Sequence, residues 1–182
     1  AAAALAAQGL NVPLGGQVKL LTGPGAPRVV ADNRGAGVTA KTHYVTVDGL
    51  TPGTTYTFNV LSDLYVDHND GAHYAVTTGP RLAPRTSDFA HGRVVLADGL
   101  TVAPGTVVHV TLRDRDGEGT TGDAASLSAL ANEKGVWRVD LATARAVGLA
   151  GAFEYSPDRE GVRVEATMEV QLTGCRETDT GH

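Results

Sequence analysis

Short runs of alternating apolar and polar residues recur along the chain, and this is the pattern of half-buried β-strands. In the first half, residues 43–50 place Val45 and Val47 on one face and Thr46 on the other. The Pro-Gly pair at 52–53 then predicts a tight turn, because proline fixes φ and glycine allows a positive φ. The pattern predicts a strand at 43–50 that ends in this turn.

Residues 55–60 continue the pattern, with aromatic and apolar residues alternating with Thr and Asn. A strand with one buried, aromatic face is the prediction. A polar loop at 67–71 separates it from residues 73–78, where Tyr74 and Val76 share a face. We expect the two strands to pair as a hairpin whose loop is longer than two residues.

The second half contains comparable runs. Residues 107–112 place their apolar side chains on one face, and a turn at 132–135 separates two strands predicted within residues 126–141. Strict alternation over residues 162–172 predicts the most regular strand of the chain. Its apolar face comprises Val162, Val164, Ala166, Met168, Val170 and Leu172.

Domain organisation follows from a break in this pattern. Residues 79–88 contain two prolines, a glycine and polar residues without an apolar period, which is typical of a linker. We predict an all-β chain of two consecutive immunoglobulin-like or prealbumin-like β-sandwich domains. The predicted domains are residues 1–80 and 91–182, joined by a short linker at 81–90.

Composition excludes several classes of function. The 15 basic and 20 acidic residues are interspersed and give a net charge of -5, so no basic stripe is present to follow phosphates. We therefore expect no nucleic-acid partner. No apolar run is long enough to span a bilayer. The single cysteine, Cys175, excludes a disulfide within the chain.

Familiar catalytic motifs are absent from the sequence. It contains no GxSxG elbow, HExxH helix, P-loop or CxxC pair. The chain is therefore predicted not to be an enzyme.

The first candidate metal-binding group lies in the predicted hairpin loop. It brings imidazoles and carboxylates together in number sufficient for a metal site. Such polar residues and glycine are also what a hairpin loop requires without any metal. The candidates are Asp67, His68, Asp70 and His73.

A second group lies in the acidic, glycine-rich stretch 114–123. Its oxygen ligands suit calcium, so calcium is the one candidate cofactor. The EF-hand pattern fails, because Ala125 stands where a glutamate is required and Gly117 comes too early. A solvated loop is the alternative. The candidates are Asp114, Asp116, Glu118 and Asp123.

The turn before residues 55–60 resembles a known family. Leu50, Pro52, Gly53, Thr54 and Tyr56, followed by Phe58 and Val60, are similar to the connection between the fifth and sixth strands of fibronectin type III domains. In that family the tyrosine closes the corner. The resemblance covers roughly residues 17–80.

The second half resembles the carboxypeptidase regulatory-like and transthyretin-like sandwiches of bacterial secreted and surface proteins. That resemblance assigns turns to Gly92, Asp98, Gly99, Pro104 and Gly105, and a later hairpin to Gly135 with Trp137. Both families are binding or spacing modules, and both imply an extracellular or cell-surface location.

The front of the chain departs from the fibronectin pattern. That fold begins with two strands, but few residues precede Gly16, and they are rich in alanine. One explanation is a trimmed fold in which residues 5–14 form a short strand. The other is a neighbouring subunit that inserts a strand into an open edge, with residues 1–14 as the candidate donor.

Two functions are compatible with these observations. The first is a non-enzymatic structural subunit of an extracellular or cell-surface assembly, such as a filament or pilus-like homo-oligomer built by edge-strand complementation. The alternative is an adhesion or carbohydrate-binding accessory module of a larger secreted enzyme. Its glycan ligand would stack on tyrosines such as Tyr44, Tyr65 and Tyr74.

Overall fold

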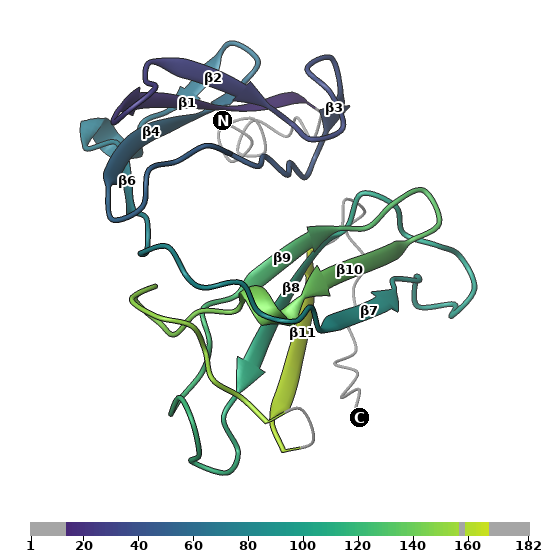
Figure 1. Ribbon diagram of the computed structural model, residues 1–182. Coiled ribbons are helices and arrows are strands. Elements are labelled where there is room, and N and C mark those ends of the chain that lie inside the picture. Colours follow the sequence, from purple (N-terminus) through teal and green to yellow (C-terminus); the bar gives the residue numbers. More distant parts are fainter. Residues whose placement is uncertain (1–13, 157–158, 168–182) are drawn as a thin grey trace. The chain divides into compact units, whose positions relative to one another are not determined.

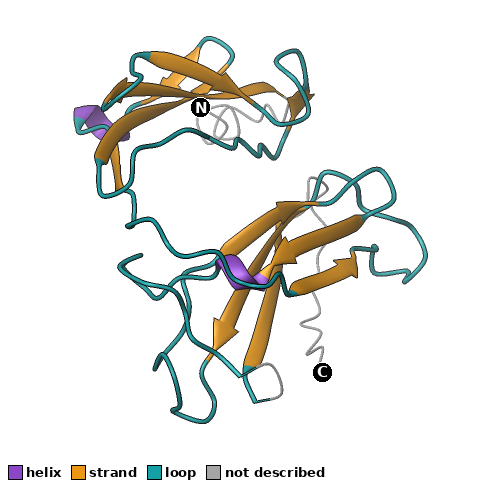
Figure 2. Ribbon diagram, viewed as in Figure 1, coloured by secondary structure: helices purple, strands orange, loops and turns teal. Residues whose placement is uncertain are grey.

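The computed structural model describes residues 14–156 and 159–167, and strands dominate its regular elements (Figure 1; Figure 2). The predicted all-β class is confirmed. The chain divides into two compact units, Ala1–Gly79 (unit 1) and Pro80–His182 (unit 2). No helix in the described part of the chain is long and apolar enough to cross a membrane.

Unit 1 contains a 6-stranded sheet in which every pair is antiparallel. The order is β2-β1-β4-β5, while β3 also pairs with β1 and β6 also pairs with β4. Its elements are β1 (Leu14–Thr22), β2 (Arg28–Ala31), β3 (Thr39–Ala40), β4 (Thr55–Ser62), β5 (Tyr65–Asp67), the 3-10 turn η1 (Asn69–Gly71) and β6 (Tyr74–Thr77).

One face of this sheet is apolar, as the register shows. Leu20 lies opposite Phe58, and Tyr56 lies opposite Val76, so these side chains share a side. We call this side the apolar face; it comprises Val18, Leu20, Val30, Tyr56, Phe58, Val60, Tyr74 and Val76. Within the described part of unit 1, the fully buried apolar residues are Leu20, Ala40 and Tyr56.

The hairpin predicted between residues 55–60 and 73–78 is confirmed, since β4 pairs with β6. Burial along β4 differs from the prediction in one respect. Asn59 is buried, while Val60 on the apolar face is 40% exposed. The ring of His73 covers Asn59 and lies 2.8 Å from its side-chain oxygen. Val60 has no comparable cover among the described residues.

The strand predicted at 43–50 is not formed, because no described strand pairs with this stretch. The alternation of burial is nevertheless the predicted one. Val45 and Val47 are half-buried, whereas Thr46 is exposed. The stretch lacks a ladder because three side chains and one backbone N–H from β2 and the loop after it, not a neighbouring strand, bind its backbone, as described below.

Unit 2 contains a 3-stranded sheet of order β11-β8-β9 and a 2-stranded sheet of order β10-β7. Its elements are β7 (Phe89–Arg93), β8 (Val107–Arg113), β9 (Leu127–Leu130), β10 (Val136–Asp140), the 3-10 turn η2 (Leu141–Thr143) and β11 (Gly161–Thr167). The core between them comprises Ala90, Val108, Val110, Leu112, Ala124, Ala129, Trp137, Val139, Leu141, Ala144 and Phe153.

The hairpin assigned to Gly135 and Trp137 is wrong in its pairing. The turn forms, with the Gly135 N–H donating to the Asn132 carbonyl at 2.8 Å. However, β10 pairs with β7 and β9 pairs with β8. Trp137 lies opposite Gly92, and a methyl group at Gly92 would meet the indole at 2.8 Å. The missing side chain at Gly92 thus lets the large ring lie against β7.

Two sequence boundaries differ from the structure. β7 begins at Phe89, within the predicted linker, and Arg85 donates to the Phe153 carbonyl at 2.9 Å. The later part of that segment therefore packs in unit 2. The strand predicted at 162–172 is present as β11 up to Thr167, and its remaining residues lie outside the described part of the chain.

Candidate functional site

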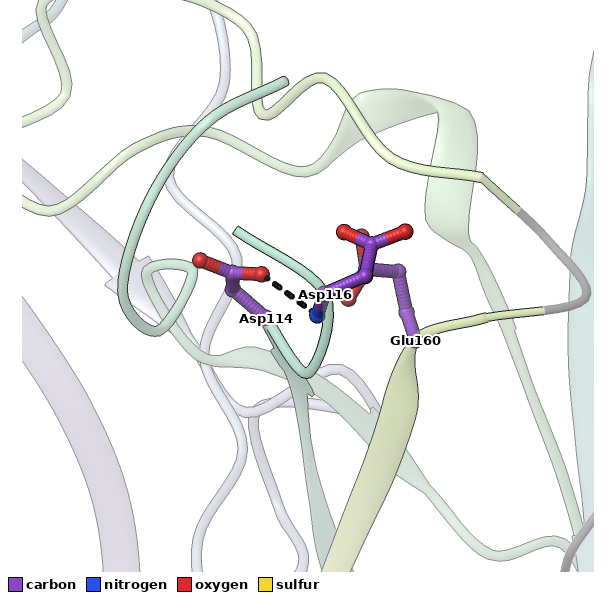
Figure 3. Close-up of side chains that lie close together, drawn as sticks. All are labelled: Asp114, Asp116 and Glu160. Atoms are coloured by element: carbon purple, nitrogen blue, oxygen red, sulfur yellow. Dashed lines mark hydrogen bonds between the residues drawn. The ribbon is translucent and has the colours of Figure 1, made fainter. Parts of the chain in front are cut away.

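The first candidate site lies where β8 and β11 pair at one end of unit 2. Asp114 and Asp116 follow β8, and Glu160 precedes β11 (Figure 3). Because Arg113 lies opposite Gly161, the register brings the residues flanking that pair together. Each of the three carboxylates offers an oxygen, and these oxygens lie within 4.8 Å of one another. Carboxylate oxygens in such a group are ligands that calcium prefers.

Most of these oxygens already have protein partners. One oxygen of Asp114 accepts hydrogen bonds from the backbone N–H groups of Asp116 at 3.1 Å and Gly117 at 2.7 Å. The other accepts from Gly122 at 3.2 Å. The bond from Gly117 is the largest influence on the pKa of Asp114, which lies below its usual value. Asp114 therefore organises the loop whether or not a cation is present.

Glu160 differs from the two aspartates. Its Oε2 accepts from the Arg115 N–H at 3.0 Å, while its Oε1 is buried and has no hydrogen-bond partner among the described residues. The guanidinium of Arg159 lies 3.8 Å from the Asp116 carboxylate and 3.1 Å from that of Glu118. A positively charged side chain therefore already lies beside the three carboxylates.

Two of the four predicted calcium ligands therefore come together, joined by Glu160, which the sequence analysis missed. Glu118 pairs with Arg159, and Asp123 lies 3.5 Å from Arg113. Only the pairing of β8 with β11 would have identified Glu160, because it lies far from the acidic stretch in sequence. Calcium binding stays a prediction.

The predicted group in the hairpin loop has a structural role. Asp67 accepts hydrogen bonds from the Asn69 N–H and from the Tyr74 hydroxyl, each at 3.0 Å. The Asn69 bond is the largest cause of its lowered pKa. His68 Nδ1 accepts from the Gly71 N–H at 2.8 Å. These bonds define a turn within the loop.

The other members of that loop group point elsewhere. His73 bonds to Asn59, and Asp70 lies at a φ of 53° in the turn. Among the described residues, Asp67, His68, Asp70 and His73 do not form a group that could hold a metal ion.

The most informative site lies in unit 1, around the buried carboxylate of Asp32. Arg34 donates to it from its backbone and from two side-chain nitrogens, at 2.9 to 3.0 Å. The Tyr44 N–H and the His43 ring lie 3.1 Å away. Burial alone would raise the pKa of Asp32, but the hydrogen bonds from Arg34, Tyr44 and His43 outweigh burial and hold it well below its usual range.

Asp32 and Asn33 fasten the stretch 43–48 along one side. The Asn33 N–H donates to the Tyr44 carbonyl, and the Thr46 N–H donates to the Asn33 side chain, each at 2.8 Å. Farther along, the Arg28 side chain donates to the Asp48 carbonyl. The backbone groups of the even-numbered residues therefore face the loop after β2 and β2 itself.

In an extended chain, neighbouring residues direct their N–H and C=O groups to opposite sides. The groups of Val45 and Val47 consequently face away from β2. No hydrogen bond to either backbone is made by residues 14–156 or 159–167. We call the backbone groups of Val45 and Val47 the open row.

Part of the apolar face of unit 1 is incompletely covered. The stretch is held against the apolar face at its end by Tyr56, whose hydroxyl accepts from the Thr51 N–H at 2.8 Å. On the same face Val60 is 40% exposed and Val76 is 39% exposed. Unit 1 thus combines an extended segment with an unpaired side and partly exposed apolar residues on β4 and β6.

Comparison with known proteins adds no assignment. No protein-family model, curated protein or solved structure gives a significant match to this chain.

Proposed function

We propose that the chain is a non-enzymatic structural module of an extracellular or cell-surface assembly, and that it joins the assembly by accepting a β-strand into unit 1. The observation that carries the proposal is the open row at Val45 and Val47. Unpaired backbone groups on an extended edge are a template for another strand.

The uncovered part of the apolar face supports the same proposal. A sheet with one apolar face needs a second layer to bury it. Within the described residues, the stretch 43–48 supplies a single extended segment of that layer over unit 1. A strand added at the open row would cover Val60 and Val76 while it satisfies the backbone groups of Val45 and Val47.

The hydrogen bonds of two histidine rings in unit 1 indicate a structural role for these histidines and not a catalytic one. His43 is bonded to Asp32, and His73 is bonded to Asn59. Both pairs fix the path of the chain around the sheet. The resemblance of the turn at 50–56 to fibronectin type III domains supports a location outside the cell or on its surface.

A proline substitution tests the open row directly. Val47→Pro removes an N–H that no described residue uses, so the sheet of unit 1 should remain intact. We expect the unmodified chain to form ordered polymers in electron microscopy. The Val47→Pro chain should remain a monomer of 18.7 kDa in light scattering.

The matched control is Asp48→Pro, which removes the N–H of the neighbouring residue on the opposite side of the stretch. This variant should polymerise as the unmodified chain does, and circular dichroism should show that both variants are folded. An unmodified chain that stays monomeric at every concentration would contradict the proposed function.

A further inference from the structure

Four aspartates of the chain are each followed by a glycine, and this sequence favours a rearrangement of the aspartate. Because glycine has no Cβ, its amide nitrogen can approach the carboxyl carbon of the preceding side chain. Attack by this nitrogen closes a cyclic imide and releases water. The pairs are Asp48 with Gly49, Asp70 with Gly71, Asp98 with Gly99, and Asp116 with Gly117.

In three of these pairs the attacking nitrogen is already engaged. Each glycine N–H donates to an acceptor within its own turn. An N–H held in this way must break its hydrogen bond before the nitrogen can attack, which slows ring closure. The bonds run from Gly71 to His68 Nδ1 at 2.8 Å, from Gly99 to the Leu96 carbonyl at 2.9 Å, and from Gly117 to Asp114 at 2.7 Å.

The carboxylates of two of these pairs are engaged as well. Asp98 accepts from the N–H groups of Leu100 and Thr101, each at 2.9 Å, and also from the Thr101 hydroxyl. The hydroxyl bond is the largest cause of the lowered pKa of Asp98. Asp116 accepts from the Glu118 N–H at 2.9 Å. A carboxylate held in its ionised form loses an oxygen as water less readily than a free carboxyl group.

The pair of Asp48 and Gly49 is free at both reacting groups. Both residues are exposed. No residue that the structure describes makes a hydrogen bond or ion pair with the Asp48 carboxylate or with the Gly49 N–H. A methyl group added at Gly49 would meet nothing within 4 Å, so the surrounding residues leave room for the ring to close.

The side chain of Arg28 lies against the same pair. Its Nη2 donates to the main-chain carbonyl of Asp48, while its Nε is buried and has no hydrogen-bond partner among the described residues. These two nitrogens form one side of the planar guanidinium. In Arg34 the corresponding nitrogens donate to the two oxygens of the Asp32 carboxylate. Arg28 therefore has the donors for a carboxylate but is bonded to a single carbonyl oxygen.

We propose that Asp48 is a site of spontaneous conversion to isoaspartate and that Arg28 directs the reaction to this product. The Gly49 nitrogen attacks Cγ of Asp48, a C–N bond forms, and the amide proton and the carboxyl hydroxyl leave as water. A second water then adds to the main-chain carbonyl carbon of Asp48, which the hydrogen bond from Arg28 polarises. The bond from this carbon to the Gly49 nitrogen breaks, and the proton of the water passes to the nitrogen.

The product has the mass of the original chain but a different backbone. The Gly49 nitrogen stays bonded to Cγ, so the chain runs through the side chain of Asp48 and is longer by one methylene group. The former carbonyl becomes a carboxylate that accepts from both Nη2 and Nε of Arg28. The longer backbone lies between the anchors at Thr46 and Thr51. This inference does not depend on the proposed function.

Peptide mapping of the full chain tests the site. The chain is incubated in neutral buffer at a temperature at which it stays folded. After digestion, mass spectrometry with electron-transfer fragmentation distinguishes isoaspartate from aspartate. Isoaspartate should accumulate at Asp48 at least about tenfold faster than in any of the other pairs, because only there are both reacting groups free.

Two controls separate the structure from the sequence. In guanidinium chloride the turns are lost, so the four pairs should react at similar rates. Asp48→Glu keeps the charge and the carbonyl that Arg28 binds but requires a larger ring, so position 48 should stay unmodified. A folded chain in which Asp48 reacts no faster than the other pairs would overturn the proposal. The same holds if the advantage of Asp48 persists in guanidinium chloride.

The role of Arg28 is tested by the ratio of the two products. In isotopically labelled water, aspartate regenerated from the imide carries the label and can be counted beside isoaspartate. Arg28→Lys lacks the paired donors, so the ratio of isoaspartate to labelled aspartate should fall at least about twofold. The unfolded chain supplies the same comparison should Arg28→Lys not fold. An unchanged ratio in both would overturn the role of Arg28, while Asp48 would stand as the modified residue.

Discussion

The hydroxyl oxygen of Tyr56 accepts a hydrogen bond from the backbone N–H of Thr51 at 2.8 Å. Tyr56 belongs to β4 and is fully buried, while Thr51 lies at the end of the stretch that carries the open row. The ring also lies against Gly23, where an added methyl group would meet it at 2.3 Å. The bond thus fixes the point at which this stretch returns to the sheet.

Tyr56→Phe should therefore destabilise unit 1. It removes only the hydroxyl and leaves the Thr51 N–H without its partner, which costs on the order of 1–3 kcal/mol. Exchange of β1 and β4 amides, measured by NMR, would report this loss for unit 1 alone. Tyr74→Phe is the control, because the Tyr74 hydroxyl bonds to exposed Asp67 and its loss should change little. Equal effects of both substitutions would contradict the corner role of Tyr56.

Acid should weaken unit 1 through Asp32. The folded-state pKa of Asp32 lies below the ordinary value of 3.8. Its stabilising contribution is therefore complete above that value and is lost as the pH falls below it. We expect the protection of β1 amides, measured relative to the intrinsic exchange rate of an unfolded chain at the same pH, to fall as the pH is lowered below 3.8.

Asp32→Asn should remove much of this acid dependence and should destabilise unit 1 at neutral pH by on the order of 2–3 kcal/mol. Asp70→Asn is the control, because Asp70 lies in the η1 turn at a φ that asparagine tolerates. If Asp32→Asn leaves the acid response unchanged, other carboxylates account for it.

The sequence predicted much of the fold because alternation records which face of a strand is buried. Val108, Val110 and Leu112 are buried as expected, and so are Trp137, Val139 and Leu141. The turn at 132–135 was also recognisable from its residue types. Its pairing was not, because local sequence does not tell whether two strands joined by a turn belong to one sheet or to two.

The stretch 43–50 shows a different limit. Its alternation correctly predicted that Val45 and Val47 are more buried than Thr46, yet no described strand pairs with it. Alternation reports on the face of a strand and carries no information about its edges. The anchoring roles of Asp32 and Asn33 were missed for a related reason, since each acts on residues that lie more than ten positions away.

The acidic group was predictable only in part. Asp114 and Asp116 were predicted as metal ligands because they lie close together in one acidic stretch of the sequence. Glu160 was not, because it reaches them only through the register of β11 against β8. In the hairpin loop the sequence allowed either a metal site or a turn. The hydrogen bonds of Asp67 and His68 are those of a turn.

Gly92→Ala should destabilise unit 2 by overpacking. A methyl group at Gly92 would lie 2.8 to 2.9 Å from the indole of Trp137, which is itself only 8% exposed. Either the ring or β7 must shift, and overpacking of this kind costs about 1–3 kcal/mol. Trp137 is the only tryptophan, so its fluorescence reports unfolding of unit 2 directly.

Gly151→Ala is the matched control within the same unit. An added methyl group there meets nothing within 4 Å, and the backbone has no positive φ. Urea unfolding followed by Trp137 fluorescence should give a lower free energy of unfolding for Gly92→Ala. For Gly151→Ala the free energy of unfolding should change by no more than about 0.5 kcal/mol. A Gly92→Ala chain as stable as the control would mean that β7 and β10 separate easily. The pairing of Trp137 with Gly92 would then not be what selects β7 over β9 as the partner of β10.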